Sequence, residues 1–174
     1  MEIKYPKGIE LVGGAIIEND QGQILMTKCP KWSNKWTTPG GHIESGEKIL
    51  DAMVRESFEE TNIKVEGVDV ICWGELINSK DFHRPAHFIY FDAYCKIIGG
   101  ELKLDDIELT DYKWLYPEEA LKLDLAESYD VSIQKFIEYK KQNKIVTDGQ
   151  NYSIEEIEKL TNFQEKYHKS KVYK

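Results

Sequence analysis

Three glutamates, Glu56, Glu59 and Glu60, crowd one edge of a segment with the apolar pattern of a helix. Each residue of an α-helix advances by about 100° around the axis, so apolar residues three or four apart form a stripe that faces the core. The three carboxylates fall along one border of this stripe, and Glu60 lies closest to the core. The stripe itself consists of Ile49, Leu50, Met53, Val54 and Ser57.

This acidic ridge is unfavourable on its own. Like charges three or four residues apart cost a few tenths of a kcal/mol each, and a carboxylate at the margin of a core costs more unless it is paired. Arg55 reaches Glu59 at i, i+4, but one cation cannot neutralise three anions. Hard divalent cations such as Mg²⁺ take oxygen ligands. The pattern therefore predicts a carboxylate metal site. Its spacing alone leaves open a solvated acidic face on a surface helix.

The wider segment "GGHIESGEKILDAMVRESFEETNI" favours the metal site. It reads as glycine, five residues, Glu, seven residues, Arg-Glu, two residues, Glu-Glu. This spacing resembles the Nudix box, and the preceding "WTTPGG" is similar to the approach to that box. The fixed positions are Gly41, Glu47, Arg55, Glu56, Glu59 and Glu60.

The resemblance implies an α/β fold, a Nudix-type α/β/α sandwich with a mixed, mostly curved sheet. The resemblance covers residues 8 to about 140, and we expect a Nudix hydrolase domain over residues 1–143. The tail has no counterpart in the resemblance, and its apolar spacing predicts a C-terminal helical extension over 144–174. Two positions depart from the family pattern, which prefers an aliphatic residue at Ser57 and glycine at Asn62. We expect the Ser57 hydroxyl to bond to the carbonyl of Met53, and Asn62 to end the helix in a left-handed conformation.

The implied chemistry is metal-assisted hydrolysis of a pyrophosphate joined to another group. Carried over residue by residue, Glu56, Glu59 and Glu60 hold Mg²⁺, or Mn²⁺, and the Gly40 carbonyl adds a ligand. Arg55 orients the carboxylates through charge-assisted hydrogen bonds. Glu47 matches another acid of the box and has a supporting role.

Four residues outside the helix are further candidates. Glu108 is our first choice of general base among the later loop acids, although a box glutamate is the alternative and a solvated loop acid the simpler interpretation. Lys28 ends a predicted strand where the family often carries a phosphate-binding cation. Arg84 either binds phosphate or pairs with a nearby acid. Trp32, in the loop before the box, either stacks on a base or packs in the core.

The remaining elements follow from apolar patterning and turn residues. A loop precedes the box over 29–41, and Ser45 is the expected N-cap of its helix over about 46–61. Pro117 begins a helix after a short strand within 110–123, and an amphipathic helix covers 131–143. Apolar residues at helical spacing between 154 and 167 either dock on the domain or form a homodimer. The expected strands are 9–20, 23–28, 64–77 and 87–97.

Composition limits the partners. A net charge of −8 over 174 residues argues against generic binding to nucleic acid or to an anionic membrane. The sequence has no apolar run near the ~20 residues that span a bilayer, and its start lacks the apolar core of a signal peptide. Three widely separated cysteines are typical of reduced thiols, so we expect a cytoplasmic protein with a small-molecule partner.

The substrate is left open among several compounds. Subfamilies that cleave ADP-ribose often carry a proline about fifteen residues after the box, and residues 77–80 lack one. This favours a nucleoside triphosphate or nucleotide sugar over ADP-ribose or a dinucleotide. A non-catalytic nucleotide-binding module is a second class of function. An isoprenoid diphosphate isomerase is a third, for which Cys29 and Cys95 lack an evident histidine partner.

Overall fold

The computed structural model describes residues 8–105 and 107–144, which form a mixed sheet flanked by helices. The described strands follow the order β3-β2-β1-β6-β5, with β4 paired to β1 and β7 paired to β2. Strands β1 and β6 run parallel, and the other described pairs are antiparallel. The strands are β1 (Glu10–Glu18), β2 (Ile24–Cys29), β3 (Lys35–Thr37), β4 (Gly40–His42), β5 (Ile63–Ile77), β6 (His87–Gly100) and β7 (Asp111–Leu115).

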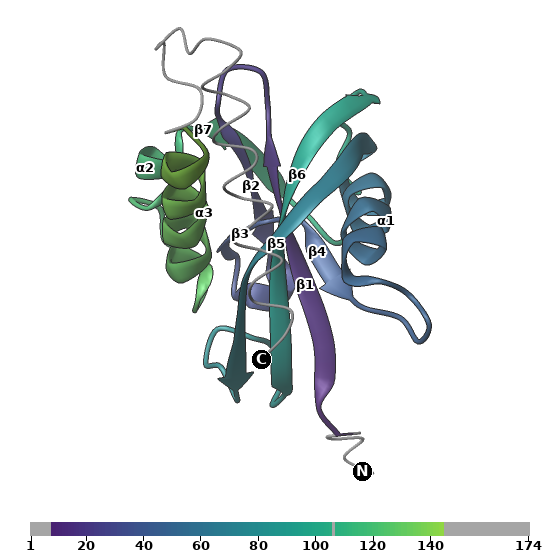
Figure 1. The fold of residues 1–174 in the computed structure, drawn as a ribbon. Coiled ribbons are helices and arrows are strands. Elements are labelled where there is room, and N and C mark those ends of the chain that lie inside the picture. Colours follow the sequence, from purple (N-terminus) through teal and green to yellow (C-terminus); the bar gives the residue numbers. More distant parts are fainter. Residues whose placement is uncertain (1–7, 106, 145–174) are drawn as a thin grey trace, which may run out of the picture. The chain divides into compact units, whose positions relative to one another are not determined.

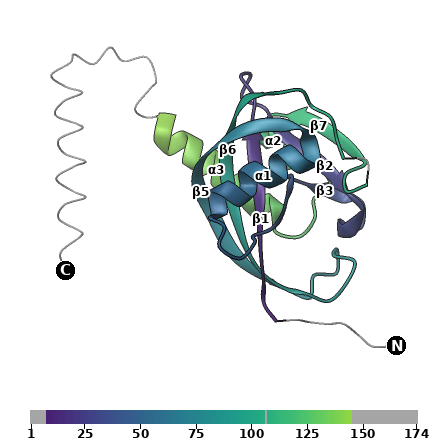
Figure 2. The ribbon, with the colours of Figure 1, turned by 90° about the vertical axis from the view of Figure 1, so that its right-hand side faces the viewer.

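The helices cover both faces of the sheet (Figure 1). One face packs on α1, where Ala52 and Met53 meet buried residues of β1 and β6. The opposite face packs on α2 and α3, where Ile133 and Phe136 are fully buried. Figure 2 shows α1 lying across the strands. This arrangement confirms the predicted α/β/α sandwich. The helices are α1 (Ile49–Thr61), α2 (Pro117–Ala120) and α3 (Tyr129–Lys144), with a short 3₁₀ helix η1 (Pro30–Trp32).

The start of α1 differs from the prediction. Ser45 is not the N-cap: the helix begins at Ile49, and Lys48 occupies the cap position without a side-chain hydrogen bond. Gly46 has a φ of +87°, so the backbone turns away from a helical path directly after Ser45. Residues 44–47 instead form a turn in which the Glu47 N–H donates to the Glu44 carbonyl at 3.1 Å.

The end of α1 agrees with the prediction. Asn62 adopts a left-handed conformation with a φ of 57°, and its N–H donates to the Phe58 carbonyl at 2.8 Å. The buried Ser57 hydroxyl donates to the Met53 carbonyl at 2.6 Å, which satisfies a polar group inside the apolar stripe. Both departures from the family pattern are therefore accommodated locally.

The four predicted strands, the helix from Pro117 and the helix near 131–143 are all present, with bounds shifted by a few residues. The loop predicted over 29–41 is wrong in part, because it contains η1, β3 and β4. These pieces are held by backbone pairing: Lys28 opposes Trp36 in β3, and Gly13 opposes Gly41 in β4. The pairing brings residues 40–42 alongside the middle of the sheet.

Contacts along the chain divide it into two compact units, Met1–Lys140 and Lys141–Lys174. The second unit lies almost entirely outside the described residues, as does the apolar pattern between 154 and 167. The domain boundary at 143/144, the helical extension and the homodimer therefore stay predictions. Within the described residues, no helix has the length and apolar character needed to cross a membrane.

Candidate active site

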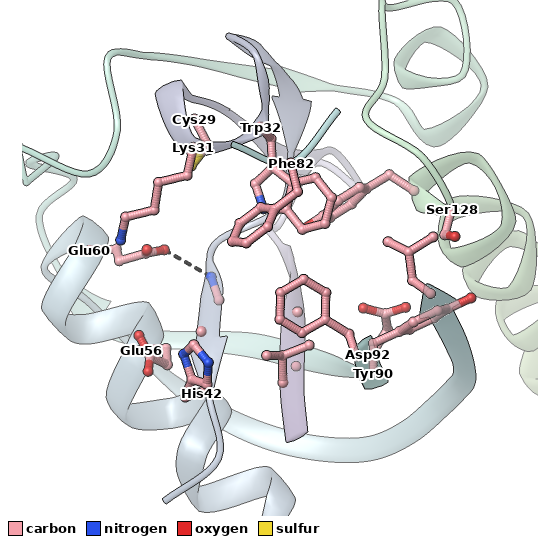
Figure 3. A pocket seen from close by; sticks show the side chains of 18 of the residues that line it. Cys29, Lys31, Trp32, His42, Glu56, Glu60, Phe82, Tyr90, Asp92 and Ser128 are labelled. Carbon is pink, nitrogen blue, oxygen red and sulfur yellow. Dashed lines mark hydrogen bonds between the residues drawn. The ribbon is translucent and has the colours of Figure 1, made fainter. Parts of the chain in front are cut away.

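A cavity of about 380 Å³ lies between α1, the middle of the sheet and the loops that precede β6 and α3 (Figure 3). Carboxylates of α1 form one wall, and Figure 3 shows Glu56 and Glu60 there. The facing part of the cavity carries aromatic rings and the acid Asp92. The aromatic lining residues are Trp32, Phe82, Phe88, Tyr90 and Tyr129.

Glu60 is the most buried carboxylate of the ridge, with 6% of the residue exposed, as its place beside the apolar stripe predicts. The Gly40 N–H donates to Glu60 Oε2 at 2.8 Å. Burial nevertheless raises the pKa of Glu60 to about 8, and the nearby Glu56 and Glu108 charges add to the increase while the Gly40 N–H opposes it. Burial also raises the pKa of Glu56. The wall thus holds carboxylates that favour a positively charged partner.

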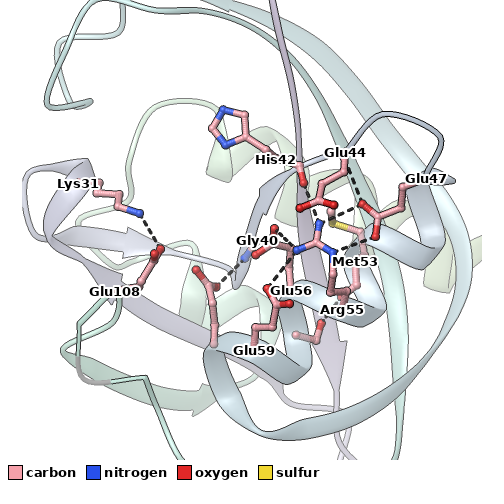
Figure 4. Close-up of polar contacts among 12 residues, drawn as sticks. Lys31, Gly40, His42, Glu44, Glu47, Met53, Arg55, Glu56, Glu59 and Glu108 are labelled. Carbon is pink, nitrogen blue, oxygen red and sulfur yellow. Dashed lines mark hydrogen bonds and ion pairs between the residues drawn. The ribbon is translucent and has the colours of Figure 1, made fainter.

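Arg55 joins the acids at the edge of the cavity (Figure 4). Its Nε and Nη2 donate to the two oxygens of Glu47 at 2.9 and 3.0 Å. Its Nη1 donates to Glu56 Oε1 at 2.8 Å and to Glu59 Oε2 at 3.1 Å, which includes the expected i, i+4 contact. Nη2 also donates to the His42 carbonyl at 3.0 Å, so one guanidinium fixes α1 against β4.

The floor of the cavity is backbone. It is made by the glycines of β1 and β4, Gly13, Gly14, Gly40 and Gly41. A Cβ on Gly40 would lie 2.1 Å from the Gly13 carbonyl oxygen, and a Cβ on Gly41 would lie 2.6 Å from Glu56 Oε1. Side chains at these positions would separate the strands or displace the acidic wall, so the spacing of the site depends on their absence.

A model of the NUDIX domain family matches residues 11–136, which span the sheet, α1 and the whole cavity. The chain belongs to the Nudix family. The match includes every element that positions the acidic wall.

Relatives of this Nudix chain have several named activities. It is 28% identical over 120 residues to a mouse bis(5'-nucleosyl)-tetraphosphatase, an alignment that covers 68% of this chain and 81% of the mouse protein. It is also 28% identical over 119 residues to the nucleoside triphosphatase NudI of Escherichia coli, covering 63% and 84%. The solution structure of the E. coli ORF135 protein has a TM-score of 0.61 and 26% identity, covering 76% and 91%.

These findings confirm the predicted family and enzyme class. The chain is a Nudix hydrolase, an enzyme that acts on phosphoric anhydride bonds. Enzymes of this family generally use divalent cations and act on small-molecule nucleotides.

The acidic wall of this Nudix domain fits a hard divalent cation in its chemistry. Its donors are oxygens. Burial raises the pKa of Glu60 and Glu56 because it disfavours their ionised forms, and a nearby cation would offset that cost. In the part of the chain that the structure describes, no three His, Cys, Asp or Glu side chains already converge as a metal site. Arg55 holds Glu56 and Glu59 through its Nη1, so these two side chains are oriented by a cation of the chain itself.

Glu108, the predicted general base, lines the same cavity as the ridge. Lys31 Nζ lies 2.6 Å from Glu108 Oε2, and both side chains are partly exposed. Lys31 also lines the cavity and lies close enough to Glu60 for their charges to interact. The pair places a cation and a fourth acid beside the α1 wall (Figure 4).

The structure brings Trp32 into the cavity but places Lys28 and Arg84 elsewhere. Lys28 Nζ lies 5.5 Å from the centre of the Trp36 ring, and Lys28 is outside the described lining. Arg84 Nη1 and Nη2 donate to the two oxygens of Glu10 at 2.7 and 2.6 Å, which realises the ion-pair alternative. Both residues therefore support the surroundings of the cavity instead of lining it.

The sequence interpretation missed Lys31 and Asp92 as lining residues. Lys31 lies in the short η1 helix, whose local sequence gives no periodic signal. Asp92, in contrast, lies in a segment with a periodic signal. Phe88, Tyr90 and Asp92 alternate along β6, so a carboxylate falls on the same face of the strand as two buried or half-buried rings.

Proposed function

We propose that this Nudix hydrolase is Mg²⁺-dependent and cleaves the pyrophosphate of a nucleoside diphosphate linked to another group. The observation that carries the proposal is the single cavity with a carboxylate wall on one side and aromatic rings on the other. Anionic diphosphate approaches the carboxylates only with a cation between them, and a planar base suits the rings. A ligand with both parts spans the two sides.

Each residue of the acidic wall has a distinct role in this proposal. Glu56, Glu59 and Glu60 hold the ion, together with the Gly40 carbonyl. Arg55 holds Glu56 and Glu59 together through its Nη1, which offsets their mutual repulsion, and Glu47 holds Arg55 through two hydrogen bonds. The bound ion supplies Lewis acidity toward the diphosphate and lowers the pKa of water. Mn²⁺ has the same preference for oxygen ligands and is a substitute.

Glu108 is the proposed general base, accepting a proton from the attacking water at its carboxylate. Its salt bridge to Lys31 is partly exposed and is therefore weakly stabilising. Lys31 leaves it readily to contact a phosphate oxygen, which frees Glu108 for the proton. Lys31 takes the phosphate-binding role that the sequence assigned to Lys28, because Lys31 is the lysine that lines the cavity.

Nucleoside triphosphates and nucleotide sugars are the favoured substrates. The name of the E. coli relative, a nucleoside triphosphatase, supports the first. The name of the mouse relative, a bis(5'-nucleosyl)-tetraphosphatase, supports the alternative substrates, which are dinucleotides and ADP-ribose. We place the protein in the cytoplasm, supported by the free thiols of Cys29, Cys72 and Cys95, all of which are buried.

The test is product release from nucleoside triphosphates, nucleotide sugars, dinucleotides and ADP-ribose, with Mg²⁺ and with EDTA. We expect metal-dependent cleavage of a phosphoric anhydride bond. In Glu60→Gln the rate of this cleavage should fall by about 100-fold or more. Full activity of a folded Glu60→Gln protein would overturn the mechanism. Nucleotide-induced thermal stabilisation without turnover of any compound would favour the non-catalytic module, and formation of an allylic diphosphate would favour the isomerase.

A further inference from the structure

Asp92 is a buried acid that the proposed chemistry does not use. It lies in β6, with 4% of the residue exposed, and it lines the cavity on the part that faces the α1 wall (Figure 3). No cation of the described residues pairs with it, and burial raises its pKa to about 7. An unpaired carboxyl this deep is costly unless it serves a ligand or a structural partner.

One oxygen of Asp92 has a structural partner. The Ser132 hydroxyl of α3 donates to Asp92 Oδ2 at 2.5 Å, which links the helix to the sheet. The other oxygen, Oδ1, receives no hydrogen bond from the described residues and lies close over the Gly14 backbone, where a Cβ would be 2.6 Å away. The same Cβ would lie 2.8 Å from Thr38 Oγ1, a buried hydroxyl that itself lacks a partner among the described residues. Of these two groups Asp92 lines the cavity, so its Oδ1 retains acceptor capacity there that the described residues do not use.

Aromatic rings line the space next to Asp92. The centres of the Trp32 and Phe82 rings are 4.7 Å apart, and those of Phe82 and Phe88 are 5.0 Å apart. Tyr90 precedes Asp92 on the same face of β6, and both line the cavity. Rings beside a buried carboxyl suit a flat heterocycle with a hydrogen-bond donor on its edge.

We propose that Asp92 is the residue that reads the base of the substrate, with Oδ1 accepting a hydrogen bond from an exocyclic amino group. The inference rests on the proposed function, because a nucleotide whose diphosphate lies at the α1 wall extends its base toward Asp92. Above its pKa of about 7 the Asp92 carboxyl is ionised and can only accept, so a carbonyl oxygen on the base would then leave both groups unpaired. Cytosine and adenine are therefore preferred over uracil and hypoxanthine, which differ by an oxo group at that position.

The test is equilibrium binding of CMP against UMP and of AMP against IMP to the full chain, at a pH well above the pKa of Asp92. We expect the wild type to bind the amino member of at least one pair about tenfold more tightly or better. Asp92→Asn keeps the shape and an acceptor for Ser132 but presents an amide, so it should lose or reverse this preference. Equal binding of both members by the wild type, or an unchanged preference in Asp92→Asn, would overturn the inference.

Ser132→Ala is the matched control for a purely structural role. It removes the hydrogen bond that joins α3 to β6 and leaves the carboxyl in place, so it should lower the melting temperature without changing the ratio of affinities. If Ser132→Ala abolishes the base preference while Asp92→Asn retains it, the preference depends on α3 and not on the Asp92 carboxyl, and the inference is wrong.

Hydrolysis is measured separately, so that the two proposals fail in different ways. Glu60→Gln should lose turnover and keep the base preference, because Glu60 and Asp92 lie on facing parts of the cavity. Base preference without turnover in the wild type would sink the proposed function and leave the role of Asp92 intact. Turnover with no base preference would overturn the role of Asp92 and leave the proposed function intact.

Discussion

The Gly40 N–H donates a hydrogen bond to Glu60 Oε2 at 2.8 Å, which joins the strand before the box helix to the deepest carboxylate of that helix. The bond fixes one oxygen of Glu60 and orients the other within the cavity. It also partly offsets the burial that raises the pKa of Glu60. Position and charge of the central acid therefore depend on a backbone group 20 residues away in sequence.

Glu60→Gln is expected to stabilise the metal-free protein at alkaline pH. Because the pKa of Glu60 is raised to about 8, the unfolded chain releases this proton above about pH 4.5 while the folded chain retains it. Glu60 therefore lowers the stability of the wild type progressively up to about pH 8, and glutamine removes that loss. The expected gain is at least about 1 kcal/mol near pH 8.5 and close to zero near pH 4.5.

Thermal unfolding in EDTA at both pH values measures this difference. Adding Mg²⁺ should then raise the melting temperature of the wild type more than that of Glu60→Gln, because the ion binds the ionised acid. If the stability of the two proteins differs by the same amount at both pH values, the raised pKa of Glu60 is contradicted.

Arg55→Lys should weaken metal binding by about 10- to 100-fold with little loss of fold. Lysine keeps the charge but cannot reproduce the forked contacts of Arg55 with Glu47, Glu56 and Glu59. The measurement is the Mg²⁺ concentration at half-maximal activity. Lys135→Ala, which removes the exposed pair with Glu138 on α3, is the control and should leave that concentration unchanged.

The two adjacent glycines should respond differently to alanine. In Gly40→Ala the new Cβ would meet the Gly13 carbonyl oxygen at 2.1 Å, a backbone clash that should destabilise the fold by about 2 kcal/mol or more. In Gly41→Ala the contact is with the Glu56 carboxylate, a movable side chain, so the fold should survive while metal-dependent activity falls. Chemical denaturation and activity assays separate the cases, and equal loss of stability in both variants would contradict this account.

Ser57→Ala should change stability by less than about 0.5 kcal/mol, or raise it slightly. Among the described residues, the Ser57 hydroxyl bonds only to the Met53 carbonyl of its own helix, and alanine has the higher helix propensity. Met53→Ala in the same stripe should cost about 2–5 kcal/mol, because Met53 is fully buried. Urea denaturation of both variants tests the contrast.

Much of the fold was predictable because its signals are local. The box helix, its end at Asn62 and the long strands β5 and β6 follow from periodicity and conformational preference. The start of the helix did not, because the left-handed turn at Gly46 overrides the capping preference of Ser45. Strand β4 was missed because Gly40 and Gly41 carry no side chains from which to read alternation, and its pairing with β1 is a long-range contact.

The site divides in the same way. The spacing of Glu56, Glu59 and Glu60 predicts their shared wall because they lie on one helix. Lys28 and Lys31 are three residues apart, and only the pairing of β2 with β3 and the turn into η1 determine which one lines the cavity. Whether Arg84 meets an acid or a ligand depends on Glu10, which is distant in sequence, and local patterns carry no information about that contact.

The glycine floor has a consequence for inhibition. A compound lying on Gly13, Gly14, Gly40 and Gly41 meets peptide groups, whose chemistry does not change when a residue is substituted. Any side chain added there would collide with Met53, Asp92, the Gly13 carbonyl or Glu56, each of which belongs to the core or to the cavity wall. An inhibitor that draws its affinity from these peptide groups would therefore leave few routes to resistance.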